Sequence, residues 1–448
     1  MSRVQRMLKH WLLFLIILFF VFAKLYVLSL YHLPGWDESV YVGMGKYIFS
    51  FGSSGVWEQI RPPLLPVVLG FFWKLGLDPV FWGELFIILC SVGLIVATYF
   101  IALKFSFPVA VISSFFVAFS PVFFLYSNYL YTHIPSVLLV TIGLLVSSSI
   151  AKGVLSTFAA LFRFPMGISL FLHRWKKELF IAAFLVAVPF FFVNYVMYND
   201  YTSESWHAVF RPLILGSSHQ QNSNEFVKEG VFYYAVVFAK EFPLLLVFLP
   251  VGAFFVWKHP VFRFFLVLAL YYHIIPNRQD RFAIEFLPFM AVISGVGLWW
   301  YVKKVRFNRI VLVFLLLLFV PVLLMDYSRM NWRSDAAPPV VSEYYSFLSG
   351  IDGNILTSDP VVAVYSDAHF VPYYFYLDTV PAIVNEWEKG AKISAVVWSE
   401  SAFPCSDSDC VAVRSILYKN ISSARKVFSG AYAGKTGNRT YEVFSYGE

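Results

Sequence analysis

Charged residues are scarce in this 448-residue chain, at 14% of the sequence. A soluble domain carries about 25% charged residues, whereas the apolar fraction here is 59%. Hydrophobic runs recur from residue 11 to residue 325, and runs of this kind cross bilayers as helices. The composition excludes a soluble core and a disordered chain. It predicts a polytopic all-α membrane bundle.

Several sequence motifs are also absent. The chain has no glycine-rich phosphate loop, no nucleophile elbow and no helix carrying a His/Glu metal pattern, so it offers no nucleotide-hydrolysing site. Of its three cysteines, Cys405 and Cys410 are spaced to close a small disulfide loop. Free thiols or half of a zinc site are the rival interpretations, but a second ligand pair is missing. The net charge of +7 does not predict nucleic-acid binding, because most basic residues lie in short loops between apolar runs.

The apolar runs predict nine candidate spans, or up to eleven with the ambiguous segments. The candidates are residues 11–31, 80–103, 107–126, 130–150, 178–198, 242–257, 261–276, 284–302 and 309–325. The stretch 153–173 is either a full span or two half-height helices that turn at Arg163-Phe164-Pro165. Residues 62–77 are apolar, short and led by proline, which favours a helix lying along the membrane surface or dipping into it.

Basic residues predict the orientation of these spans. If 153–173 is a hairpin, the lysines and arginines between spans fall mostly on the side of the N-terminus, which the positive-inside rule makes cytoplasmic. The loops 32–62, 199–228 and 276–283 and the C-terminal region then face outside.

Polarity becomes ordinary at Asp326. We therefore expect a transmembrane domain over residues 1–325 and a soluble external domain over residues 326–448. Its pattern predicts a small α/β domain. The expected strands are 354–357, 361–365 and 395–398, and the expected helices are 342–348 and 384–389.

Asp37 and Glu38 follow the first predicted span by a few residues, between Trp36 and Ser39. Carboxylates held at a membrane surface are available for acid–base work on lipid-linked substrates, and partial burial would raise their pKa toward a useful range. A solvated turn with two uninvolved acids is the alternative interpretation. Asp37 is the preferred general base.

Arginines are candidates for binding a phosphate, because the guanidinium fork matches phosphate oxygens. Arg278, Asp280 and Arg281 lie in one short external loop, and Arg61 ends the first external loop. For the loop with Arg278, Asp280 and Arg281, the alternative interpretation is a structural Arg–Asp pair. Arg163 interrupts an apolar segment, where a charge needs a partner or a polar cavity. His207 and Arg211 lie in the long polar loop 199–228. Together with Asp280 they are candidates for binding the acceptor or for covering the site as a lid.

Taken in order, several segments resemble the GT-C glycosyltransferases. These segments are Trp36 to Tyr41, Arg61-Pro62-Pro63, Leu161 to Pro165, the tyrosine-rich stretch from Phe232 to Leu245, and Arg281-Phe282 with Leu287-Pro288 after it. The superfamily includes protein O-mannosyltransferases, bacterial aminoarabinose transferases and the mannosyltransferases of GPI assembly.

The resemblance implies a membrane enzyme that moves a sugar, such as a mannose-like hexose, from a polyprenyl- or dolichyl-phosphate donor to an acceptor hydroxyl. The reaction would invert the anomeric configuration on the external face. Asp37 would be the base, supported by Glu38. Arg278 and Arg281, followed by Arg61 and Arg163, would bind the donor phosphate. The acceptor would be a protein or a glycolipid.

The resemblance implies no metal cofactor, although Asp37, Glu38 and Asp280 are of the right type to hold one. The protein would lie in the plasma membrane of a prokaryote or the endoplasmic reticulum of a eukaryote. Two other functions remain open: a lipid or solute transporter that passes an anionic headgroup, and a non-catalytic scaffold.

Overall fold

The structure is a computed structural model of the chain. It describes residues 10–30, 32–222, 230–304, 322, 324–328, 339–351, 353–357, 359–372, 393–398, 415, 418–419, 421, 424–434 and 437–445. Two compact units emerge from its contacts. The helical unit comprises residues 1–29, 60–62 and 84–333, and the mixed unit comprises residues 30–59, 63–83 and 334–448.

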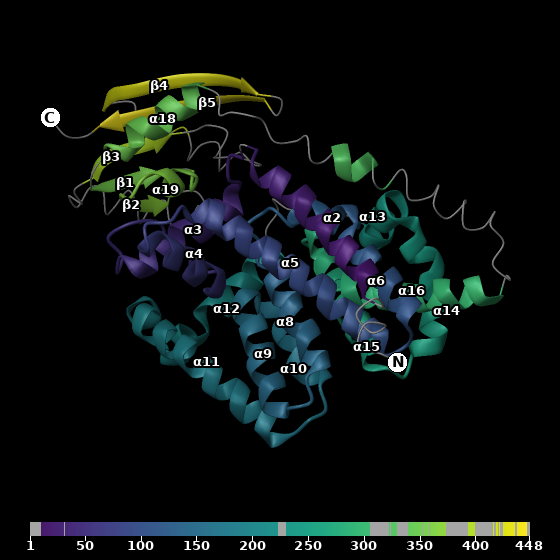
Figure 1. Cartoon of the computed structure of the whole chain (residues 1–448). Coiled ribbons are helices and arrows are strands. Elements are labelled where there is room, and N and C mark those ends of the chain that lie inside the picture. Colours follow the sequence, from purple (N-terminus) through teal and green to yellow (C-terminus); the bar gives the residue numbers. More distant parts are fainter. Residues whose placement is uncertain are drawn as a thin grey trace. The chain divides into compact units, whose positions relative to one another are not determined.

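Helices make up the described part of the helical unit (Figure 1). In chain order they are α2 (Trp11–Leu28), α5 (Pro79–Leu103, in this unit from Glu84), α6 (Phe107–Ala118), α7 (Pro121–Tyr126), α8 (His133–Leu145), α9 (Ser149–Phe162), η1 (Phe164–Ile168), α10 (Ser169–Leu172), α11 (Lys177–Tyr198), η2 (Asn199–Tyr201), α12 (Ser205–Asn222), α13 (Tyr233–Glu241), α14 (Pro243–Val256), α15 (Pro260–Ile274), η3 (Asp280–Glu285) and α16 (Leu287–Lys304).

The predicted membrane bundle is confirmed, since eight of the nine candidate spans coincide with described helices; the ninth, 309–325, lies almost entirely outside the described residues. Among the described residues, α2, α5 and α11 are long and apolar enough to cross a membrane alone. The pair α13 and α14, bent by 116°, would make a fourth. The remaining apolar helices are shorter, so the count of nine to eleven spans stays a prediction.

Close backbone contact holds α14 against α16. A Cβ atom on Gly252 would lie 1.8 Å from the carbonyl oxygen of Ile293, and one on Gly297 would lie 2.2 Å from that of Phe248. Only glycine permits this approach, because any larger residue would force the two backbones apart. The close approach fixes the middle of α16 against α14.

The ambiguous stretch 153–173 is a hairpin, as we expected. Helix α9 ends at Phe162, Arg163 is extended at φ −156°, and η1 begins with Phe164-Pro165. The chain then returns through α10 to the end from which α9 started. There the ring of His173 lies 5.3 Å from that of Phe264, near the first turn of α15, and its Nε2 would lie 3.3 Å from a Cβ atom on Gly143, near the end of α8.

Basic residues gather at that same end of the bundle. The Lys104 ammonium donates to the carbonyl oxygen of Leu144 at 3.5 Å, and the rings of Phe105 and His259 are 4.8 Å apart. Burial lowers the pKa of His173 to about 4, and the positive charges of Lys152 and Arg263 contribute. We call this region the basic end. Its assignment to the cytoplasmic side stays a prediction from the positive-inside rule.

The mixed unit is built on a five-stranded sheet in the order β2-β1-β3-β5-β4. Its strands are β1 (Asn354–Thr357), β2 (His369–Pro372), β3 (Ile393–Trp398), β4 (Arg425–Gly434) and β5 (Gly437–Ser445). Strand β1 pairs in parallel with β2 and β3, whereas β5 pairs antiparallel with β3 and β4. This mixture confirms the small α/β domain expected at the C-terminus.

One hydrophobic core joins this sheet to two helical segments, residues 339–349 and 362–365. Helix α18 (Pro339–Ser349) packs on the sheet through Tyr344, whose ring centroid is 4.7 Å from that of Tyr441. Val56, from the predicted first external loop, is fully buried in the same core. Helices α3 (Trp36–Phe49) and α4 (Leu64–Lys74) pack closely on each other in this unit. The loop that carries Asp37 therefore folds with the C-terminal sheet as one compact unit.

Helix α4 coincides with the surface helix predicted over 62–77. It buries Leu65 and Leu69 and exposes Val67, Phe71 and Leu75. These three exposed residues repeat every fourth position and so share one face. An apolar exposed face suits a helix lying on a membrane surface, and that location stays a prediction.

One predicted strand is wrong. Residues 361–365 contain the short helix α19 (Val362–Tyr365), not a strand. The Asp359 carboxylate accepts the Val361 N–H at 3.0 Å, and Pro360 precedes the helix. An acidic cap followed by proline starts a helix, and the short apolar run alone does not distinguish helix from strand. The predicted helix 384–389, Cys405 and Cys410 lie outside the described residues.

Candidate active site

The segment from Asn277 to Phe286 places most of the predicted arginines within one polar region of the helical unit. It contains η3 and packs against α7, α8, α13, α15 and the start of α16. Pro288 in the first turn of α16 is tolerated there because the first helical amides need no partner within the helix. We call the side chains gathered around this segment the η3 cluster.

A buried ion pair lies at the centre of the η3 cluster. The Arg163 Nε pairs with Oε1 of Glu285, whose side chain is fully buried. The same Oε1 atom is 2.8 Å from Nδ1 of His133, the first residue of α8. The Tyr272 hydroxyl at the end of α15 donates to Oε2 at 2.5 Å, and the Arg163 Nε donates to that hydroxyl oxygen at 3.2 Å. Four separate segments therefore meet at one carboxylate.

The partner predicted for a buried Arg163 is thus identified as Glu285. The Arg163 guanidinium carbon also lies 4.7 Å from the centre of the Phe282 ring, a cation–π distance. A charge pair with several additional hydrogen bonds is how a low-dielectric interior accommodates an arginine. The pair holds the break after α9 against η3.

Asp280 and Arg281 form a second group within the η3 cluster. The Tyr126 hydroxyl donates to Oδ1 of Asp280 at 2.8 Å, and the Arg281 N–H donates to the same atom at 2.8 Å. The Arg281 guanidinium lies over the Tyr131 ring, 4.5 Å from its centroid. Tyr129 stacks on Tyr131 with ring centroids 5.8 Å apart. The arrangement holds a cation beside an aromatic wall.

Arg278 is anchored through the backbone. Its Nη2 donates to the carbonyl oxygen of His273 at 2.8 Å, close to the C-terminal end of α15. The neighbouring Gln279 donates to the Asn277 side-chain oxygen at 3.0 Å, and Asn277 is buried. Two arginines and one aspartate of the predicted loop are thus held in defined positions. A cationic site of this kind suits a phosphate group chemically.

Asp37 and Glu38 start α3 in the mixed unit. The fully buried Glu38 carboxylate accepts the Gly35 N–H at 2.7 Å and lies 2.9 Å from Nε2 of His32. Glu38 therefore caps the helix start and secures the preceding turn. Asp37 is half-buried beside it in the first turn. Acidic side chains are favoured at this position by the helix dipole.

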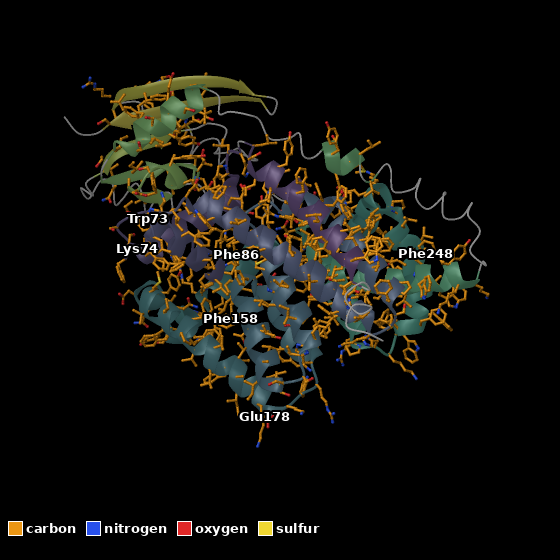
Figure 2. The ribbon with its side chains drawn as sticks, viewed as in Figure 1. Trp73, Lys74, Phe86, Phe158, Glu178 and Phe248 are labelled. Atoms are coloured by element: carbon orange, nitrogen blue, oxygen red, sulfur yellow. The ribbon has the colours of Figure 1, made fainter. Side chains whose placement is uncertain are left out.

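A buried lysine fixes the third turn of α3. The Lys46 ammonium donates to the carbonyl oxygens of Val364 at 2.9 Å and Ser366 at 3.1 Å, and it pairs with Asp367 at 2.9 Å. The Trp73 indole of α4 donates to the same Asp367 carboxylate at 3.2 Å. Trp73 and Lys74 (Figure 2) line a cavity of about 570 Å³ there.

The other predicted site residues lie elsewhere. His207 and Arg211 are on α12, where the Arg211 guanidinium is 5.9 Å from the centre of the Tyr198 ring. Arg61 belongs to the helical unit. In the sequence it lies in the short stretch 60–62, which separates the segments 30–59 and 63–83 of the mixed unit. Among the described residues, no group of three or more His, Cys, Asp or Glu side chains is arranged to hold a metal ion.

Sequence reasoning missed Glu285 and Lys24. Glu285 begins an apolar run, and Lys24 interrupts the first span. Lys24 is buried in α2, donates to the carbonyl oxygen of Phe124 and lies 3.4 Å from the centre of its ring. An isolated charge inside an apolar run is the signal that would have found both residues.

No protein-family model matches the chain, and no curated protein matches its sequence. Solved structures do match. ArnT from Cupriavidus metallidurans, bound to undecaprenyl phosphate, aligns at a TM-score of 0.65 and 13% identity over 95% of this chain and 97% of ArnT. The fold is that of the GT-C membrane glycosyltransferases.

Two further structures share this GT-C fold. The oligosaccharyltransferase AglB from Archaeoglobus fulgidus, in complex with an inhibitory peptide and a dolichol-phosphate, aligns at a TM-score of 0.60 and 12% identity, over 98% of this chain and 74% of AglB. The arabinofuranosyltransferase AftD from Mycobacteria aligns at a TM-score of 0.50 and 13% identity, over 100% of this chain and 40% of AftD. The GT-C likeness therefore extends over both units of this chain.

Proposed function

We propose that this chain is an integral-membrane glycosyltransferase that uses a polyprenyl- or dolichyl-phosphate sugar. The observation that carries the proposal is the GT-C fold over nearly the whole chain, combined with the arginines of the η3 cluster. The ArnT and AglB structures hold undecaprenyl phosphate and dolichol-phosphate respectively, which supports a lipid phosphate as the donor here.

In the proposed reaction the acceptor hydroxyl oxygen attacks the anomeric carbon of the sugar. A new glycosidic bond forms as the bond from that carbon to the phosphate oxygen breaks, which inverts the configuration. The hydroxyl proton passes to the Asp37 carboxylate, and the lipid phosphate leaves with the bonding electron pair. Asp37 acts as a general base, a role that contributes about 10²- to 10⁴-fold in rate.

The leaving phosphate gains negative charge, so catalysis needs cations where that charge develops. Arg281 and Arg278 are our first candidates. The contact of Arg281 with the Tyr131 ring and that of Arg278 with the His273 carbonyl oxygen hold both guanidinium groups in place before the donor binds. Because Arg163 is already paired with buried Glu285, we assign it to positioning η3. Arg61 remains a secondary candidate.

The remaining roles belong to the same proposal. Glu38 positions Asp37 by capping α3. His207 and Arg211 on α12 contact the acceptor or cover the site, and Asp280 orients Arg281. The donor sugar is a mannose-like hexose, and the acceptor is a protein or glycolipid hydroxyl on the external face. The reaction needs no metal ion.

A transfer assay tests the proposal. Purified wild-type protein in lipid nanodiscs should transfer labelled hexose from a polyprenyl-phosphate sugar to an acceptor, and Asp37→Asn should lower the rate by about 10²-fold or more. A Glu343→Gln variant, which changes an exposed carboxylate of the mixed unit, is the matched control and should transfer normally. Wild-type rates in Asp37→Asn would remove Asp37 from the mechanism. Lipid or solute flux without sugar transfer would contradict the enzyme assignment.

A further inference from the structure

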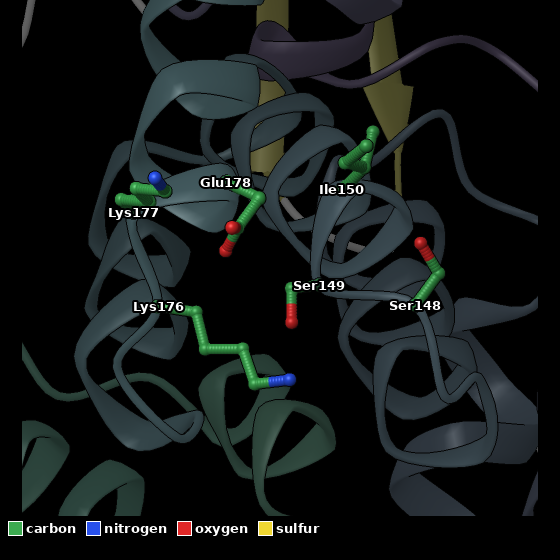
Figure 3. A pocket seen from close by; sticks show the side chains of 6 residues that line it. All are labelled: Ser148, Ser149, Ile150, Lys176, Lys177 and Glu178. Carbon is green, nitrogen blue, oxygen red and sulfur yellow. The ribbon is translucent and has the colours of Figure 1, made fainter.

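The basic end of the helical unit contains a polar cavity that the proposed reaction does not use. Its volume is about 520 Å³. Ser148, Ser149 and Ile150 line it from the start of α9, and Lys176, Lys177 and Glu178 line it from the start of α11 (Figure 3). Helix α9 has 14 residues and so places Arg163 about 21 Å away along its axis. The cavity is thus separate from the η3 cluster.

Opposite charges face this cavity from neighbouring positions. Figure 3 shows the Lys176 ammonium below the Ser149 hydroxyl and the Glu178 carboxylate above it, pointing into the space between the two segments. All of these side chains except that of Ser149, which is half-buried, are exposed, and Figure 2 shows Glu178 at the outer margin of the helical unit. The Ser148 hydroxyl accepts the Ala151 N–H at 3.3 Å and caps α9. The lining therefore offers two ammonium groups, two hydroxyls and one carboxylate to an occupant.

Exposed aromatic and apolar side chains flank the cavity residues of α11 along the chain. Phe171 and Trp175 are 59% and 68% exposed, and their rings pack at 6.3 Å. Tryptophan at this position is typical of the membrane–water interface. Along α11, Ile181, Phe184 and Leu185 are also exposed. An occupant of the cavity would thus have an apolar helix face beside it that accepts acyl chains.

We propose that this cavity binds the headgroup of a phospholipid that carries both a phosphate and a primary ammonium, as phosphatidylethanolamine does. The phosphate pairs with Lys176 and accepts from Ser149, and the ammonium pairs with Glu178. The acyl chains lie along α11. By the positive-inside assignment, the lipid comes from the cytoplasmic leaflet.

Glu178 decides between lipid classes. A purely anionic headgroup such as phosphatidylglycerol would satisfy Lys176 but would be repelled by Glu178. A choline headgroup has no N–H to donate to the carboxylate. Basic pockets between transmembrane helices on the cytoplasmic side are known as lipid headgroup sites, and the acid added here narrows the choice to a zwitterion with N–H donors.

Native mass spectrometry on the full-length protein in detergent tests the proposal. Phosphatidylethanolamine, phosphatidylglycerol and phosphatidylcholine with matched acyl chains are added at equal concentration, and soluble phosphoethanolamine serves as a competitor. Lys176→Gln and Glu178→Gln change cavity residues. Lys258→Gln, which also removes an exposed charge near the basic end, is the matched control. A thermal unfolding curve for each variant confirms that it is folded.

We expect the wild type to retain phosphatidylethanolamine severalfold better than either other lipid. Lys176→Gln should lose retention, Glu178→Gln should lose the preference over phosphatidylglycerol, and Lys258→Gln should match the wild type. Equal or better retention of phosphatidylglycerol by the wild type would overturn the proposal. Displacement by equimolar phosphoethanolamine would show that the free headgroup, and not a lipid, is the ligand, and would overturn it as well.

Discussion

At the residue scale, Glu285 joins three other segments of the helical unit through its side chain. One fully buried carboxylate receives Arg163, His133 and Tyr272. Moving two charges into a low-dielectric interior is costly, so such a pair is retained only when its hydrogen bonds are satisfied. Here the pair connects the broken helix after α9 to the segment that presents Arg278 and Arg281. Its value lies in fixing that geometry.

We predict that Glu285→Gln destabilises the protein by about 3–5 kcal/mol, because it leaves the Arg163 charge buried without its counter-charge. Denaturant unfolding of the purified protein in detergent measures the loss. The double variant Arg163→Met with Glu285→Leu should recover much of it, since apolar residues often replace a buried ion pair at little cost. A single variant as stable as the wild type would show that the pair does not hold η3.

Residue roles were only partly predictable. The sequence marked Arg163 as a buried charge that needs a partner, and it marked Arg278, Asp280 and Arg281 as one group. It did not identify the partner, because Glu285 is 122 positions away and only the helix packing brings the two together. Hydrophobic periodicity carries no information on which charges meet inside a bundle.

At the element scale, the carboxylates of Asp37 and Glu38 at the start of α3 have different roles. Glu38 is buried and accepts the Gly35 N–H, whereas Asp37 is half-buried in the same turn. Glu38→Ala should cost about 1–3 kcal/mol, because a buried amide loses a charged acceptor. Asp37→Asn should cost less while removing transfer. Thermal unfolding and transfer rates on both variants check this division, and a Glu38→Ala protein as stable as the wild type would contradict it.

Lys46, in the same helix, makes the stability of the protein depend on pH. Burial lowers its pKa below the ordinary 10.5, and the nearby carboxylate of Asp367 only partly offsets the effect. Between the lowered value and 10.5 the unfolded chain binds more protons than the folded chain, so stability rises with pH in that window. Other groups also titrate in that window. Comparing the wild type with a variant that lacks Lys46 removes their contribution, because both proteins contain them.

The stability of the wild type relative to Lys46→Met should therefore increase as the pH is raised through the alkaline range toward 10.5. Unfolding midpoints of the two proteins, measured side by side at each pH, give this difference. Asp367→Asn should steepen the rise, because it removes the charge that opposes the shift. A difference that stays flat or falls with pH would show that the Lys46 ammonium is not penalised by burial.

Elements were easier to predict than residues. Long apolar runs determined the helices of the bundle, and the break at Arg163-Phe164-Pro165 was visible because a charge precedes a proline there. The strand predicted for residues 361–365 was wrong because a five-residue apolar run fits either a strand or a helix. The Asp359 cap that decides the matter depends on where β1 ends.

At the scale of the whole molecule, the two compact units do not follow the division of the sequence at Asp326. The sequence divides at Asp326 by polarity, yet residues 30–59 and 63–83 belong to the same compact unit as the C-terminal sheet. Composition could not show this, since Val56 joins the sheet core across about 300 residues of chain. The ArnT and AglB structures share this fold at only 13% and 12% sequence identity.

We propose that the η3 cluster binds the phosphate of a lipid-linked sugar. A cryo-electron microscopy structure of the protein in nanodiscs, with a polyprenyl-phosphate sugar bound, measures this directly. We predict phosphate oxygens within hydrogen-bond distance of the Arg278 or Arg281 guanidinium. A phosphate bound at the basic end, or anywhere without contact to these two arginines, would contradict the account.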